Sequence, residues 1–121
     1  MPSPEPKDKS VVVVLRKAPL SSESATEALR VAVGQGLAPQ KVTLCLLDDG
    51  VWTVGPVNPS VVRAPEIKKH LDALLMLGHR VVVEEEAAQA RGLGHPASGV
   101  EVKPRAECFA LLTEADAVIA Y

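Results

Sequence analysis

The chain has 121 residues, which is enough for one domain with a substantial core and too few for two. Its net charge is −2 and its cationic side chains are scattered, so we expect no nucleic-acid partner, because phosphate binding needs a concentrated basic face. The apolar runs fall far short of the ~20 residues that span a bilayer, and two cysteines are too few for a disulfide framework.

The N-terminal segment, residues 1–10, is polar and proline-rich and has no apolar signal region. We therefore expect a disordered leader, a single domain over residues 11–121, and a cytoplasmic protein whose thiols stay reduced. Val11–Arg16 is apolar up to its last residue and begins with four β-branched valines, which is typical of a strand buried on both faces of a parallel sheet. A helix is expected next, because Ser24 and Glu27 have capping-box spacing and the apolar residues after them share one face.

The middle of the chain repeats this alternation. Lys41–Gly50 predicts a second buried strand that stops in a turn at its last three residues, Asp-Asp-Gly. Residues 51–64 contain several turn-forming residues and predict one long loop. Pro65 then suits the first turn of a helix, whose buried stripe is expected to be Ile67, Leu71, Leu74 and Leu75. Met76 and Leu77 lie off that stripe, so they add apolar surface suited to a subunit contact.

The last third of the chain supplies three more strands. Arg80–Glu84 is apolar and predicts the third strand, and Glu85–Arg91 a short helix closed by Gly92. A shorter strand over Gly99–Val102, a last helix opened by Pro104 and a terminal strand over Ala117–Tyr121 follow. We expect the last helix to turn Cys108, Phe109, Leu112 and Ala115 inward. Strands that alternate with helices predict right-handed crossovers and a mainly parallel five-stranded sheet, with helices on both faces.

Common catalytic and binding motifs are missing. The segment after the first strand lacks the glycine pattern of a phosphate loop, and the three histidines lack metal-ligand spacing, so we expect no cofactor and no metal. Cys45 falls inside a strand that is apolar on both faces, and Cys108 on an apolar helical stripe. Both are expected to be core residues, since burial raises a thiol's pKa and makes it inert.

Acidic residues gather where the second and third strands end. Asp48 and Asp49 follow the second strand, and Glu84, Glu85 and Glu86 follow the third. They suit a solvated turn and a helix N-terminus, respectively. They also suit the polar wall of a cleft, because ligands bind outside the carboxyl ends of strands in open α/β sheets. The residues alone leave both interpretations open.

The order and spacing of several segments resemble the DsrE/DsrF family of small sulfur-relay proteins, most of all its TusC/DsrF branch. The segments are VLRKAP before a helix of small residues, LLDDGVWTV after the second strand, HLDALLMLGHRVVVEE, the QARGL turn and the ending LLTEADAVIAY. The resemblance runs from about residue 11 to residue 121, which is nearly the whole chain. The resemblance implies a flavodoxin-like fold, assembly into trimers, hexamers or hetero-hexamers, and work in cytoplasmic sulfur trafficking.

The resemblance also implies a departure from the family's chemistry. Members of the DsrE/TusD branch carry sulfur as a persulfide on a cysteine eight residues before the glycine of the RG turn. Here that glycine is Gly92, and counting back gives Glu84, whose carboxylate cannot accept a sulfane sulfur. We therefore expect an accessory subunit that is not a catalyst by itself and that associates with itself or with a DsrE- or TusD-like sibling.

Two other functions remain open from the sequence. The first is a small-ligand-binding protein or enzyme that uses a cleft lined by Arg16, Asp49, Gly50, Glu84 and Glu85. The second is a redox protein that uses Cys108. For the subunit contact we expect Trp52, Met76 and Leu77, because they carry apolar surface beyond the needs of one small core.

Overall fold

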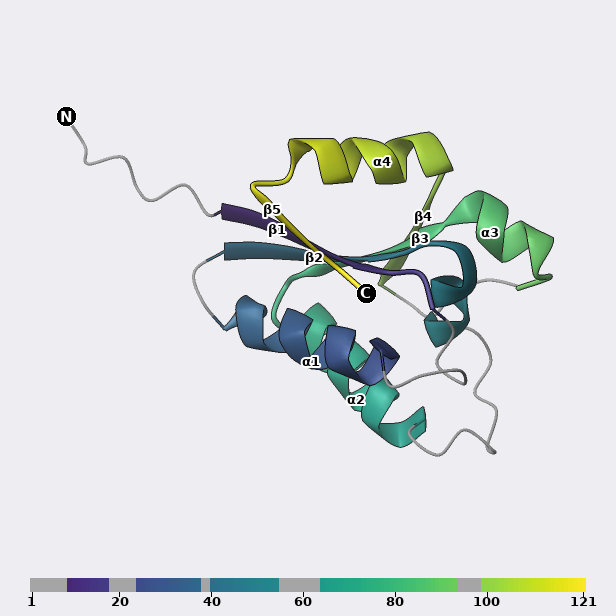
Figure 1. Cartoon of the computed structure of the whole chain (residues 1–121). Helices are drawn as coiled ribbons and strands as arrows, with labels where there is room; N and C mark the ends of the chain where they lie inside the picture. The colour runs from purple at the N-terminus through teal and green to yellow at the C-terminus, as the bar shows by residue number, and fades with distance from the viewer. Residues whose placement is uncertain (1–8, 18–23, 38–39, 55–63, 94–98) are drawn as a thin grey trace.

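The computed structural model describes residues 9–17, 24–37, 40–54, 64–93 and 99–121, and its strands alternate with helices as the sequence predicts (Figure 1). The elements are β1 Lys9–Leu15, α1 Ser24–Gly36, β2 Gln40–Leu46, the 3-10 helix η1 Asp48–Val54, α2 Ala64–Met76, β3 Arg80–Glu84, α3 Glu85–Ala90, β4 Val100–Lys103, α4 Arg105–Glu114 and β5 Ala117–Ala120. β1 begins two residues earlier than expected. The rest of the expected leader, residues 1–8, lies outside the described residues.

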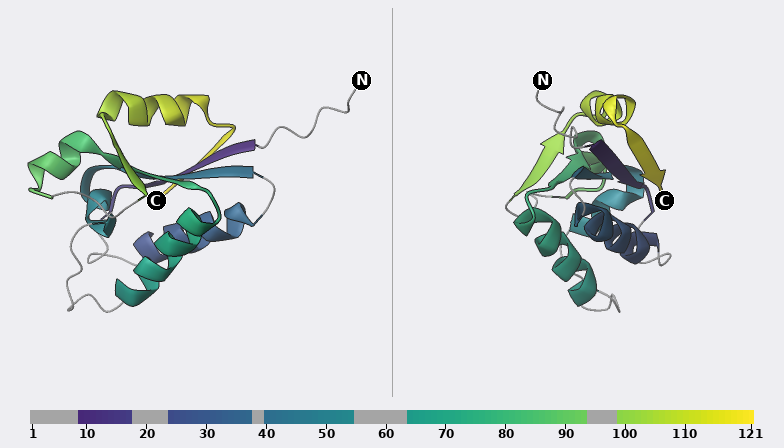
Figure 2. Two further views of the ribbon diagram at one scale, coloured as in Figure 1. Left: turned by 180° about the vertical axis from the view of Figure 1, so that it is seen from behind. Right: turned by 90° about the vertical axis from the view of Figure 1, so that its left-hand side faces the viewer.

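The five strands form one sheet in the order β4-β3-β2-β1-β5, and all four neighbouring pairs are parallel. The connections from β1 to β2 and from β2 to β3 step in the same direction, so right-handed crossovers place α1 and α2 on one face. The connection from β4 returns past β1 in the opposite direction, and α4 lies on the other face (Figures 1 and 2). The predicted open parallel α/β fold with both faces covered is confirmed.

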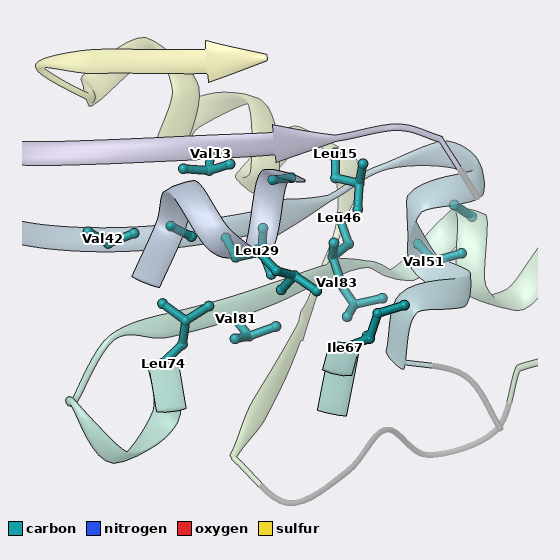
Figure 3. Packing of buried hydrophobic residues seen from close by; sticks show 14 residues of the cluster. Val13, Leu15, Leu29, Val42, Leu46, Val51, Ile67, Leu74, Val81 and Val83 are labelled. Atoms are coloured by element: carbon teal, nitrogen blue, oxygen red, sulfur yellow. The ribbon is translucent and has the colours of Figure 1, made fainter. Parts of the chain in front are cut away.

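The larger core lies between the sheet and helices α1 and α2 (Figure 3). Alternate strand residues point to opposite faces, so every second residue of β1, β2 and β3 enters this layer. Its buried members are Val13, Leu15, Ala28, Leu29, Ala32, Val42, Leu44, Leu46, Val51, Ile67, Leu74, Val81, Val83 and Ala87. The expected stripe of α2 is confirmed, with Ile67 and Leu74 buried and Leu71 and Leu75 partly buried against the core.

The smaller core lies between the sheet and α4. It contains Val12, Val14, Cys45, Leu47, Val82 and Cys108, with Leu111, Leu112 and Ala115 packed against it. The expected inner position of Phe109 is wrong, because its side chain is 43% exposed. Leu111 takes the inward place instead, since the helix turns Cys108 directly onto the sheet and Phe109 lies about 100° further round the helix.

The segment after β2 is more regular than the long loop that the sequence predicts. Asp48–Val54 forms η1 and buries Gly50, Val51 and Thr53, while residues 55–63 lie outside the described ones. The Gly50 backbone lies directly against the carbonyl oxygen of Leu15, where a β carbon would collide with it. This contact fixes the turn after β2 against the end of β1.

Within the described ranges, no helix is both long enough and apolar enough to cross a membrane.

Candidate functional site

The carboxyl edge of the sheet brings together the ends of β2, β3 and β4. Glu84 is the last residue of β3 and pairs in register with Lys103 of β4. Its side chain lies on the α4 side of the sheet, two residues after Val82 of the smaller core. Only 1% of Glu84 is exposed. The expected side chain at the mouth of a cleft is therefore a buried carboxylate in this chain.

Two donors from other elements meet the Glu84 carboxylate. The backbone N–H of Asp48 donates to Oε1 at 3.0 Å, and Nη1 of Arg105 donates to Oε2 at 3.3 Å. Asp48 has φ 50°, a left-handed conformation that aspartate tolerates better than most residues. The two contacts compensate much of the cost of burying the charge, because each carboxylate oxygen has a hydrogen-bond donor.

Arg105 is the basic residue of this site, in the place where the sequence suggested Arg16. Its Nη1 also lies 3.6 Å from the Asp48 carboxylate, and its guanidinium lies over the Phe109 ring at 5.0 Å from the centroid. Its backbone N–H donates to Glu86 at 2.8 Å. The Arg105 side chain is 49% exposed, so the ion pair joins a buried carboxylate to a cation that is in contact with solvent.

The other residues expected in the cleft lie around this pair but do not converge on it. Asp49 binds Arg91 through Nη2 at 2.8 Å and Nε at 3.0 Å, which links η1 to the turn after α3. Arg16 is exposed, and among the described residues its hydrogen bond runs from its backbone N–H to Tyr121 at 3.4 Å. Glu85 is half-buried at the start of α3.

The two thiols form a buried pair below Glu84. Both side chains are fully buried in the smaller core, and Sγ of Cys108 donates to the carbonyl of Lys103 at 3.7 Å. Burial, followed by the neighbouring Cys108 and Glu84, raises the pKa of Cys45 to about 12, and burial likewise raises that of Cys108. Their expected placement in the core is confirmed. Within the described part of the chain no three His, Cys, Asp or Glu side chains are arranged to hold a metal ion.

The side chains expected at a subunit contact divide between two opposite edges. Met76 and Leu77 lie at the amino edge and are exposed, Met76 by 87%. Leu37 at the end of α1 is 75% exposed at the same edge, and the sequence reasoning missed it. His79 joins these helix ends, because Nδ1 accepts from the Val42 N–H at 3.2 Å and Nε2 lies 3.0 Å from the Gly36 carbonyl. Trp52 is exposed on η1, at the carboxyl edge.

Comparison with known proteins gives concordant results. The model of the DsrE/DsrF-like family matches residues 9–121. A protein described as "Protein TusC homolog" from Pseudomonas aeruginosa is 31% identical over 115 residues, which cover 92% of this chain and 97% of that protein. The crystal structure of the ychN protein from E. coli has the same fold, with a TM-score of 0.78 at 23% identity over 93% of this chain and 99% of that one. The resemblance predicted from the motifs is confirmed, and the chain belongs to the DsrE/DsrF-like family.

Proposed function

We propose that this protein is an accessory subunit of a cytoplasmic sulfur relay, which carries no persulfide of its own and works by binding a cysteine-bearing sibling. Family membership supports the relay, because sulfur trafficking is the work that the resemblance implies. The similarity to a TusC homologue supports the accessory branch.

The buried Glu84 carboxylate is the observation that carries the proposal. Glu84 stands eight residues before Gly92, where the resemblance implies a sulfur-carrying cysteine. A carboxylate has no thiolate sulfur that could attack a sulfane sulfur. Its contacts with Asp48 and Arg105 also give the side chain a structural role at this edge.

Neither remaining thiol is suited to replace the missing one. The thiolate is the nucleophile in sulfur transfer, and burial with a raised pKa keeps Cys45 and Cys108 protonated and shielded from donors. The same two properties argue against a redox role for Cys108. A shared cleft is not favoured either, because Glu84 is buried and Asp49 is held by Arg91.

The proposed partner is a DsrE- or TusD-like sibling, alone or together with further copies of this chain. Leu37, Met76 and Leu77 at the amino edge and Trp52 at the carboxyl edge supply exposed apolar side chains at opposite ends of the sheet. Contacts at two separate edges suit a closed trimer or hexamer, in which each subunit touches more than one neighbour.

The test is co-expression of the chain with the DsrE- or TusD-like proteins of its own genome, followed by size-exclusion chromatography and intact-mass analysis. We expect a stoichiometric complex in which a persulfide donor adds sulfur to the sibling alone. A chain that stays separate from every such sibling refutes the partner role. Sulfur on this chain inside the complex refutes the accessory role.

A further inference from the structure

The groups that hold the Glu84 carboxylate are positioned independently of residue 84. The Asp48 N–H is fixed by the turn after β2, where the Leu47 N–H donates to the Leu15 carbonyl at 3.0 Å. The main chain of Arg105 is held at the start of α4 by its backbone bond to Glu86, and its guanidinium also contacts the Phe109 ring and the Asp48 carboxylate. Neither donor lies on β3, so both should keep their places when the side chain at position 84 changes.

We propose that the Asp48 N–H and the Arg105 guanidinium form a binding site for one small monoanion, and that Glu84 fills this site from within the chain. The two donors come from different elements and lie 3.0 Å and 3.3 Å from the two oxygens of the buried Glu84 carboxylate. One donor is charged, and charge-assisted hydrogen bonds are the stronger kind. The ligand that fits is a compact carboxylate, whose two oxygens can each meet one of the two donors.

The neighbouring charges leave the site selective for an anion. The Asp48 carboxylate competes for the same Arg105 nitrogen, but it is longer at 3.6 Å and exposed to solvent, which screens it. Glu86 uses the backbone N–H of Arg105 and not its guanidinium. Lys103 is the register partner of Glu84 on the neighbouring strand, so this strand pair carries a further basic residue.

This inference deepens the proposed function, and its biological meaning rests on that function. The absence of sulfur carriage would then depend on one side chain, while the donors that stabilise a negative group at the end of β3 are retained. An anionic side chain of similar length at position 84 would meet the same two donors.

Replacing Glu84 with alanine provides a direct test on the isolated full-length chain. The change Glu84→Ala removes Cγ, Cδ and both oxygens, which together are the heavy atoms of acetate. Acetate should therefore restore the missing group, whereas acetamide has the same shape without the charge. The midpoint of thermal unfolding is measured by the fluorescence of Trp52, the single tryptophan, which lies on η1, the element that begins at Asp48.

We expect acetate to raise the unfolding midpoint of Glu84→Ala saturably toward that of the wild type, by clearly more than acetamide does. The wild type, whose site is filled, should show no saturable shift. The double variant Glu84→Ala, Arg105→Met should lose the difference between acetate and acetamide.

Equal shifts with acetate and acetamide would mean that the ligand only fills a cavity, and would overturn the anion site. If Glu84→Ala does not fold in plain buffer, the same pair of ligands is compared in refolding from urea. Acetate must then restore native fluorescence where acetamide does not, and failure of both refutes the proposal. No partner enters this experiment, so its result is independent of whether the chain binds a sibling.

Discussion

The backbone of Gly50 lies against the carbonyl oxygen of Leu15, with no space for a side chain between them. We predict that Gly50→Ala displaces η1 and lowers the free energy of unfolding by about 1–3 kcal/mol, as overpacking against backbone does. Gly34 in α1 is the matched control, because a β carbon there meets nothing within 4 Å. Gly34→Ala should stabilise the protein by about 0.5–1 kcal/mol. Urea unfolding measures both, and equal effects would contradict the tight contact at Gly50.

The Glu84–Arg105 ion pair should matter more to stability than the Arg80–Glu101 pair. Glu84 is buried, whereas the side chains of Arg80 and Glu101 are 44% and 36% exposed. Glu84→Gln keeps an acceptor for the Asp48 N–H but loses the charge, so we expect a loss of about 1–3 kcal/mol. Glu101→Gln should cost less than about 1 kcal/mol, because solvent screens that pair. Similar losses from urea unfolding of the two variants would show that Glu84 is not held as described.

The sequence predicts those parts of the fold and site that depend on residues close together in the chain, and it does not predict contacts that depend on the order of the strands. The valine-rich runs and the spacing of Leu71, Leu74 and Leu75 are local signals, and they predict the strands and α2 correctly. The partner of Glu84 is not local. Arg105 reaches it because β4, which precedes α4, pairs with β3, and no pattern in the sequence fixes that strand order.

The sequence did not determine which face of α4 lies on the sheet, for a different reason. Apolar residues occupy its whole circumference, so the stripe through Cys108 could be drawn through either Phe109 or Leu111. The structure turns Leu111 toward the sheet and leaves Phe109 outside beneath the Arg105 guanidinium. Likewise, η1 begins at Asp48 in a left-handed conformation, which the Asp-Asp-Gly sequence indicates only as a turn.

The Cys45 thiol should make stability fall at alkaline pH. Burial raises its pKa from the ordinary value of 9.0 to about 12. Between these values the unfolded chain loses the proton and the folded chain keeps it, so the unfolded state binds fewer protons and the free energy of unfolding falls as pH rises. Below pH 9 the thiol is protonated in both states, so it causes no change of the free energy of unfolding with pH. Cys45→Ala should remove this part of the decline when urea unfolding is compared between pH 8 and pH 10.5, and identical slopes would argue against a buried, protonated thiol.

The amino edge should mediate self-association or sibling binding. Leu77→Glu places a charge where Leu37 and Met76 expose apolar surface, and burying that charge in a contact is costly. We expect sedimentation to show dissociation of the assembly at micromolar concentration, while Leu77→Met leaves it intact. An assembly that survives Leu77→Glu would place the contact elsewhere on the molecule, and a monomeric wild type would remove the idea of self-association.

The absence of a sulfur-carrying thiol is the central claim, and sulfur loading of the wild-type chain tests it most directly. The folded protein is incubated with a persulfide donor, and intact and peptide masses are recorded beside a cysteine-bearing sibling treated in the same way. A thiol-blocking reagent applied to unfolded chain confirms that both cysteines are chemically intact. We predict no added sulfur on the folded chain, because Glu84 has no thiol and Cys45 and Cys108 are buried with raised pKa values. A stoichiometric sulfur adduct on Cys45 or Cys108 of the folded chain would contradict the account.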